Sequence, residues 1–165
     1  MRTLLVLVVG MACTSTPAPI APSAPTALAQ LEASRDLDGV VVGHGETPTV
    51  VVVLASWCEH CKAELRELDA IRAHHVRLIG VDYRGHEEYD HRGGADAIRA
   101  FARATPWLRI VPVDDTLFDA LGRPPLIPTI YVYDRAGALV QTFDRRQRTP
   151  PDRAELAALL ERLGA

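Results

Sequence analysis

The sequence predicts an α/β sandwich in which a mixed central sheet is flanked by helices. Apolar, largely β-branched runs alternate along the chain with segments whose apolar residues recur at helical spacing. Near the end, two apolar runs flank the turn sequence Asp134-Arg135-Ala136-Gly137, a pattern typical of a hairpin. A hairpin gives antiparallel neighbours, whereas strand–helix–strand units give parallel ones. Together these patterns predict a sheet that contains both pairings.

The expected elements follow from these patterns in chain order. Four consecutive valines open the first strand and are typical of a strand covered on both faces. The helix after it carries Leu65, Leu68 and Ile71 on one stripe. Polar residues and three glycines at 82–94 predict a loop or insertion. Strands are expected at 50–54, 76–81, 109–113, 129–133 and 138–143, and helices at 58–74, 95–104, 117–121 and 151–163.

Length and composition exclude several classes of protein. The chain has 165 residues, 48% of them apolar, which fits one domain with tails and argues against a disordered chain. Its net charge of −3 argues against a nucleic-acid-binding protein. Three cysteines are too few for a scaffold held together by disulfides. We therefore expect a compact domain, which we interpret as a monomer that needs no cofactor and no metal.

The first residues resemble an export signal. Met1 and Arg2 are followed by an apolar run that is too short to span a bilayer, and then by Cys13. A small residue followed by cysteine after such a run resembles a bacterial lipoprotein processing site, although Gly10 stands where that pattern prefers leucine. An ordinary secretory signal is the alternative. We expect a signal peptide at 1–12, lipidation at Cys13, and attachment to the periplasmic side of a bacterial membrane, with Thr14 favouring the outer membrane.

A tether is expected to follow the lipidated cysteine. Residues 14–30 carry no charge and four prolines, a composition that cannot bury enough apolar surface to order itself. We therefore expect a disordered Pro/Ala/Ser/Thr tether at 13–36 and a single folded domain at 37–165. If lipid occupies Cys13, two thiols remain.

These two thiols, Cys58 and Cys61, lie where a buried strand becomes a helix. Residues three apart share a helix face, so the two sulfurs can form a small disulfide. Cys58 would lie at the helix N-terminus, where free N–H groups and the helix dipole favour a thiolate by about 2 kcal/mol at most. A larger effect needs a second cause, and we assign it to His60, with Glu59 beside it.

This arrangement predicts thiol–disulfide exchange. Cys58 would attack a substrate disulfide, and Cys61 would then attack Cys58 and release the reduced substrate. Cys61 must lose a proton for its step, and Glu64 is three residues beyond it on the same face. A carboxyl group beside an apolar stripe is expected to have a raised pKa, which suits proton transfer. The alternative is that Glu64 is an ordinary solvated carboxylate.

The motif Trp57-Cys58-Glu59-His60-Cys61 after an apolar strand resembles the thioredoxin superfamily. A second mark is Ile127-Pro128-Thr129 before a β-rich run. The resemblance implies that Pro128 is cis and packs against the cysteines, that Ile127 offers its backbone to an extended substrate segment, and that Trp57 shields the disulfide and contributes to docking.

Within the thioredoxin superfamily, this sequence most resembles exported members of the TlpA/ResA type. They carry a helical insertion before the cis-proline half, which residues 84–104 resemble, and a glutamate that Glu64 matches. The resemblance implies a thiol–disulfide oxidoreductase for protein substrates, acting as a reductant, drawing on a membrane electron donor, with cytochrome c biogenesis as one setting.

Two departures from the superfamily pattern leave alternatives open. Val52 stands where thioredoxin has a buried aspartate, so a proton relay must run elsewhere. His60 replaces the usual proline and is more like DsbA, an oxidant of exported proteins. A third hypothesis is a copper-handling module that uses Cys58, His60 and Cys61, since soft thiolates suit Cu(I).

Overall fold

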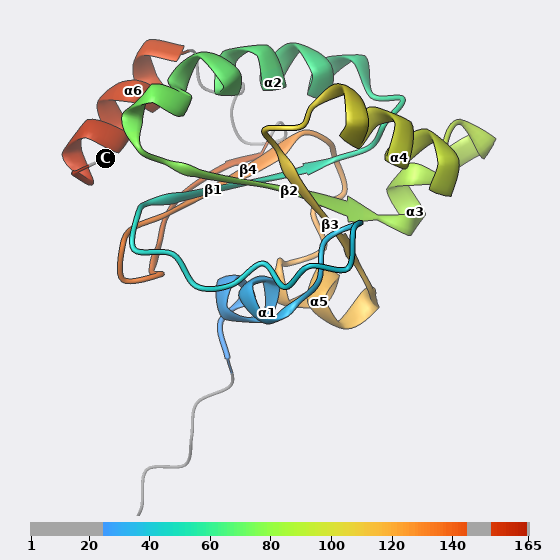
Figure 1. The fold of residues 1–165 in the computed structure, drawn as a ribbon, viewed down its shortest axis with the longest axis horizontal. Helices are drawn as coiled ribbons and strands as arrows, with labels where there is room; N and C mark the ends of the chain where they lie inside the picture. Colours follow the sequence, from blue (N-terminus) through green and yellow to red (C-terminus); the bar gives the residue numbers. More distant parts are fainter. Residues whose placement is uncertain (1–24, 145–152, 165) are drawn as a thin grey trace, which may run out of the picture.

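The computed structural model describes residues 25–144 and 153–164 and shows a mixed five-stranded sheet between two layers of helices (Figure 1). The strand order is β3-β2-β1-β4-β5. β1 is parallel to β2 and antiparallel to β4, so the predicted mixed sheet is confirmed. The strands are β1 (Thr49–Leu54), β2 (Arg77–Tyr83), β3 (Arg109–Val113), β4 (Thr129–Tyr133) and β5 (Leu139–Asp144).

Helices cover both faces of the sheet. In Figure 1, α2, α4 and α6 lie on one face and α1 and α5 on the other. The helices are α1 (Ala27–Ala33), α2 (Glu59–Ile71), α3 (Arg84–Glu87), α4 (Ala95–Ala104), α5 (Asp115–Ala120) and α6 (Arg153–Arg162), with 3-10 turns η1 (Arg72–His74) and η2 (Tyr89–His91).

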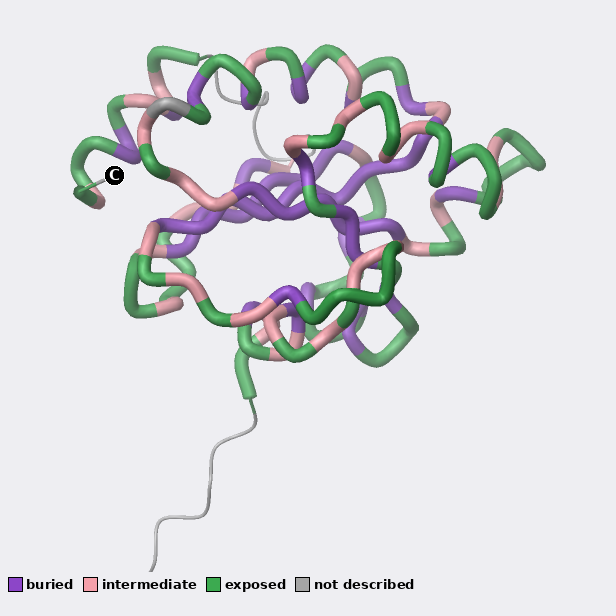
Figure 2. The backbone as a smooth tube through the Cα atoms, in the orientation of Figure 1, coloured by how far each residue is buried: buried purple, intermediate pink, exposed green. Residues whose placement is uncertain are grey.

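The central strand β1 is buried on both faces, as its valine run predicts. Every residue of β1 is buried, and Figure 2 shows the buried backbone concentrated in the sheet between the helix layers. Val52 and Leu54 point into the cluster under α2 and α6, whereas Val51 and Val53 point into the cluster over α1 and α5. The alternating faces of one strand therefore supply both cores.

The segment that contains residues 82–94 is more regular than the predicted loop. β2 continues through Asp82 and Tyr83 because β3 pairs with both of them. The chain then forms α3 and η2, and an ion pair between Arg84 and Glu88, 2.9 Å apart, spans one helical turn. Of the two alternatives, a loop or an insertion, the structure shows a helical insertion, as the resemblance implies for residues 84–104.

The expected tether ends earlier than residue 36. Thr26 caps α1 by accepting a hydrogen bond from the backbone of Ala29, and Leu28 and Leu31 are buried beneath the sheet. The sequence predicted a disordered tether here because residues 14–30 carry no charge. The spacing of Leu28 and Leu31 nevertheless suits a single apolar helix face. The signal peptide, Cys13 and the remainder of the expected tether lie outside the described residues.

The C-terminal half agrees closely with the sequence predictions. β4 has the predicted bounds, and β5 is shifted by one residue. In the connecting turn, the Asp134 side chain accepts hydrogen bonds from the backbones of Ala136 and Ala138, both at 2.9 Å. In α6, Leu156, Leu159 and Leu160 are buried in the cluster that includes α2. The expected start of α6 at Pro151 lies outside the described residues.

Candidate active site

The two cysteines lie at the junction between β1 and α2. β1 ends at Leu54, and the backbone N–H of Cys58 donates to the carbonyl of Ala55 at 3.1 Å, which closes a tight turn. Cys58 is the N-cap of α2, and its sulfur accepts a hydrogen bond from the backbone N–H of Cys61 at 3.1 Å. The sulfur of Cys58 therefore takes the place of the oxygen that usually caps a helix, and it faces N–H groups that stabilise an anion.

Cys58 and Cys61 form a disulfide. Their Cα atoms are 5.2 Å apart, within the usual range for such a bond. Cys61 is fully buried, whereas Cys58 is 4% exposed to solvent. Both residues belong to the apolar cluster under α2. Cys58 is therefore the more exposed of the two residues, and its role as the attacking cysteine stays a prediction.

The residues between the cysteines point into solvent. Glu59 and His60 are exposed in the first turn of α2. Lys62 donates to the Glu59 carboxylate at 2.7 Å, and this hydrogen bond and the charge of Lys62 lower the pKa of Glu59. Part of the negative charge that Glu59 brings to the helix start is therefore neutralised by Lys62.

Glu64 is buried on the inner face of α2. Glu64 is 8% exposed to solvent and is one of the buried residues of the helix. Cys61 lies one turn before it, and Leu65 and Leu68 follow it. This placement differs from the solvated carboxylate that was the alternative interpretation. A carboxyl group with this burial is a suitable acceptor for a proton from Cys61.

The second predicted motif, Ile127-Pro128-Thr129, lies at the same end of the sheet as the β1–α2 junction. The Ile127–Pro128 peptide bond is cis, as the resemblance implies. Thr129, which follows it, pairs with Val53 near the end of β1, so this bond and the β1–α2 junction share one sheet end. Ile127 and Trp57 are partly buried and pack against the apolar cluster that contains both cysteines.

Sequence analysis missed three residues next to this site, namely Ser56, Asp82 and Glu87. Glu87 accepts hydrogen bonds from the backbone N–H and the hydroxyl of Ser56, at 2.7 and 2.5 Å. Asp82 and Glu87 are both buried although they belong to a segment rich in exposed polar residues. A sequence signal existed for Asp82, because it directly follows the apolar run of β2 and so remains in register with the sheet.

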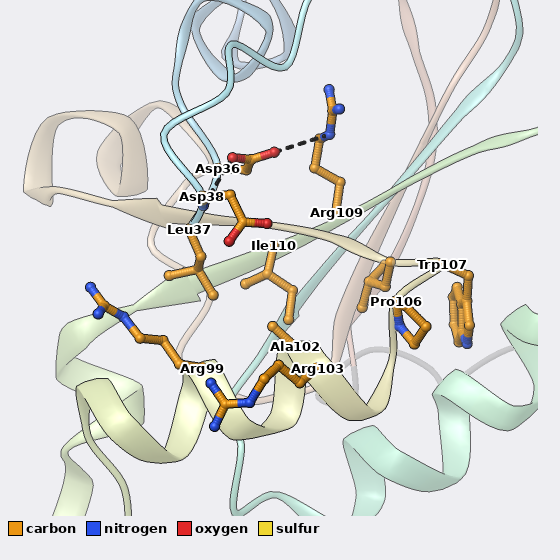
Figure 3. A pocket seen from close by; sticks show the side chains of 11 residues that line it. Asp36, Leu37, Asp38, Arg99, Ala102, Arg103, Pro106, Trp107, Arg109 and Ile110 are labelled. Carbon is orange, nitrogen blue, oxygen red and sulfur yellow. Dashed lines mark hydrogen bonds and ion pairs between the residues drawn. The ribbon is translucent and has the colours of Figure 1, made fainter.

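A cavity of about 810 Å³ lies elsewhere on the molecule (Figure 3). It is bounded by α4, by the start of β3 and by the segment that follows α1, and Asp36 pairs across it with Arg109 at 3.3 Å. Its lining includes neither cysteine nor the Ile127–Pro128 bond. The cavity is therefore separate from the disulfide site.

The described residues contain neither a cluster suited to a metal ion nor a helix suited to a membrane. Within 25–144 and 153–164, no group of three or more His, Cys, Asp and Glu side chains is arranged to hold a metal ion. In the same ranges, no helix combines the length and the apolar character needed to cross a membrane.

The fold and the disulfide site can be compared with those of solved proteins. This chain combines a mixed five-stranded sheet, a disulfide at the start of the helix after β1 and a cis-proline before β4. Its fold is similar to that of solved disulfide oxidoreductases. No protein-family model matches the chain, and no curated protein matches it. The similarity to solved structures therefore carries the comparison.

Three solved structures illustrate this similarity. DsbF of Mycobacterium tuberculosis has a TM-score of 0.62 and 21% identity, over 81% of this chain and 96% of that one. A secreted disulfide oxidoreductase of the same organism, homologous to Escherichia coli DsbE, has a TM-score of 0.60 and 17% identity, over 78% and 93%. The exposed lipoprotein thioredoxin Etrx1 of Streptococcus pneumoniae has a TM-score of 0.59 and 16% identity, over 78% and 96%. At these identities the likeness establishes the fold.

Proposed function

We propose that this protein is an exported thiol–disulfide oxidoreductase that exchanges disulfides with protein substrates through Cys58 and Cys61. The observation that carries the proposal is the disulfide at the N-terminus of α2, with Cys58 as the helix cap and Cys61 fully buried. A disulfide with only a structural role does not need to lie at a helix N-terminus. A redox-active disulfide benefits from this position, because the helix N-terminus stabilises the thiolate of the reduced form.

The exchange proceeds in two displacements when the protein acts as a reductant. The Cys58 thiolate attacks one sulfur of the substrate disulfide, so a mixed disulfide forms and one substrate thiolate leaves. The Cys61 thiolate then attacks the Cys58 sulfur, which restores the Cys58–Cys61 disulfide and releases the second substrate thiolate. Two electrons pass from the protein to the substrate, and the leaving thiolates take up protons from solvent or from a nearby acid.

Glu64 is the proposed proton acceptor for the second displacement. Cys61 is fully buried and must become a thiolate before it can attack. Glu64 follows it by one turn on the same inner face of α2. A general base in this position contributes about a hundredfold or more to a proton-transfer step.

The proposed docking surface for the substrate includes Trp57, Ile127 and Pro128. Ile127 lies just before β4, so its backbone can pair with an extended segment of the substrate. Leu126, which precedes Ile127 in the chain, is 41% exposed and adds apolar surface beside it. Recognition through the substrate backbone and apolar contacts would accept many protein sequences.

The proposed direction of electron flow is reduction of the substrate, with an oxidant of exported proteins as the second candidate. His60 between the cysteines favours the second candidate, because a nearby imidazolium stabilises the thiolate form. The redox potential of the couple separates the two: about −270 mV is typical of thioredoxin and about −120 mV of DsbA. Equilibration with glutathione at several ratios gives this value for the purified domain.

We also propose that residues 1–12 direct export, that Cys13 carries the lipid, and that a membrane reductase supplies electrons. The apolar run before Cys13 supports export. Incorporation of labelled palmitate during bacterial expression tests the anchor. Label is expected in the full chain and not in Cys13→Ser.

Insulin reduction driven by dithiothreitol tests the enzymatic proposal. Cys58→Ser is expected to abolish the stimulation, whereas Cys13→Ser, the matched change at the third cysteine, is expected to retain it. Cys61→Ser is expected to accumulate a mixed disulfide that mass spectrometry detects. Full activity in Cys58→Ser would contradict the proposed function.

A further inference from the structure

The insertion after β2 holds the two residues that precede Cys58. Glu87 of α3 is buried and accepts both hydrogen bonds that Ser56 can donate. The indole N–H of Trp57 donates to the backbone carbonyls of His86 and Glu87, at 3.1 and 2.9 Å. The position of the chain before Cys58 therefore depends on α3.

The chain folds closely around the Glu87 carboxylate. The backbone N–H of Gly94 is its third donor, at 3.0 Å. A Cβ at Gly93 would overlap both the carboxylate and the carbonyl of Glu87, so a glycine is required there. Three hydrogen-bond donors from two segments of the chain therefore converge on the Glu87 carboxyl group and fix its position.

Asp82 is a second buried carboxyl group close to Glu87. It is 7% exposed, and its Oδ1 atom has no hydrogen-bond partner among the described residues. It lines a cavity of about 460 Å³, and its sheet neighbours Leu54 and Pro112 carry no charge. The other charged residues that line this cavity are Arg84 and Glu87 from α3, Glu88 directly after α3, Arg99 from α4 and Asp36 from the segment after α1.

These surroundings disfavour a charge on Asp82. Burial first, and then the negative charges of Glu87 and Glu88, raise the pKa of Asp82 to about 7. Of the other charged residues that line the cavity, Arg84 pairs with Glu88 at 2.9 Å, and Asp36 pairs with Arg109 at 3.3 Å. In acid Asp82 is therefore neutral, and above neutrality it places a second negative charge near Glu87.

We propose that Glu87 is a positioning residue for Cys58, acting through Ser56 and Trp57, and that the protonation state of Asp82 adjusts this positioning and the stability of the Cys58 thiolate. The inference rests on the proposed function and adds a group that controls its pH dependence. When Asp82 ionises, it repels the Glu87 carboxylate and the thiolate of the reduced site. The reduced form becomes less stable relative to the disulfide.

The equilibrium with glutathione at pH 5.5 and pH 8 tests this role. The fraction of reduced protein gives the equilibrium constant for reduction of the Cys58–Cys61 disulfide by glutathione. At pH 8, this constant is expected to be at least threefold higher for Asp82→Asn than for the wild type. At pH 5.5, where Asp82 is protonated in the wild type, the two constants are expected to agree. Asp96→Asn, the same change at an exposed residue in the first turn of α4, is expected to match the wild type at both values of pH.

Glu87 needs a separate measurement because its replacement can also disturb folding. Glu87→Gln is expected to change the equilibrium constant at both values of pH, and Glu87→Asp to restore it in part. If Glu87→Gln does not fold, Asp82→Asn decides the question. An equal effect of Asp82→Asn at both values of pH, or none at either, would overturn the inference. Absence of any exchange in the wild type would instead overturn the proposed function.

Discussion

Glu64 lies one helical turn after Cys61 on the inner face of α2, and both residues are buried. Carboxyl groups are seldom buried in this way. In the proposed function, Glu64 accepts the proton of Cys61 before the second displacement. A substitution of Glu64 therefore tests this proton transfer.

Glu64→Gln is expected to slow the attack of Cys61 by tenfold or more, because glutamine cannot accept the thiol proton. The first attack by Cys58 should proceed at its normal rate, so the mixed disulfide with glutathione accumulates. Acid quenching followed by mass spectrometry measures this species over time. Glu67→Gln is the matched control, because Glu67 lies on the same helix and pairs at the surface with Arg153 at 3.1 Å. Unchanged kinetics in Glu64→Gln would remove Glu64 from the mechanism.

Asp82 is expected to make the folded state less stable as pH rises. Its pKa is about 7 in the folded protein and has an ordinary value near 3.8 in the unfolded chain. Between these values the folded state binds more protons than the unfolded one, so the free energy of unfolding falls with increasing pH. A difference of about three pKa units corresponds to about 4 kcal/mol as an upper bound above pH 7.

Urea unfolding of the reduced protein from pH 4.5 to pH 8 measures this dependence. Asp82→Asn is expected to flatten the curve and to be more stable than the wild type at pH 8. Asp115→Asn is a suitable control, because hydrogen bonds from Tyr83 and Arg123 lower the pKa of Asp115 and keep it ionised across this range. Parallel curves for the wild type and Asp82→Asn would contradict the assigned pKa.

The sequence patterns predicted the sheet well because its strands are apolar on both faces. Val50 to Val53 can only be covered on two sides, and the cysteines follow at a spacing that fits a helix N-terminus. The cis bond before Pro128 was predicted from the resemblance alone, since residue statistics strongly favour a trans bond. These predictions depend on residues close together in the chain.

The missed features depend on contacts between distant segments. Glu87 reads as a surface residue among charged neighbours, and its burial results from a contact with Ser56, 31 residues earlier. The ordering of α1 likewise depends on Glu32, whose carboxylate pairs with Arg77 of β2 at 2.5 Å. Periodicity reports which face of an element is apolar. It does not report which polar side chains another segment will cover.

Helix α1 is expected to belong to the folded domain. Leu31→Ala should lower the free energy of unfolding by about 2–5 kcal/mol, because Leu31 is fully buried in the cluster over α1 and α5. A chain that begins at residue 25 should retain the stability of one that begins at residue 14, whereas a chain that begins at residue 37 should lose several kcal/mol. Urea unfolding compares the three. Equal stability of all three would show that α1 contributes nothing to the core.

His60→Pro tests how far the exposed residue between the cysteines controls the redox potential. A positive charge near the helix start stabilises the Cys58 thiolate, so its removal should make the couple more reducing. Because His60 is exposed, solvent screens this interaction, and we expect a shift of about 20–30 mV, which corresponds to about 1 kcal/mol for two electrons. His60→Gln, which removes the charge without adding a proline ring, separates the electrostatic contribution from the effect of the ring. If His60→Gln leaves the potential unchanged while His60→Pro lowers it, backbone geometry rather than charge determines the potential of this site.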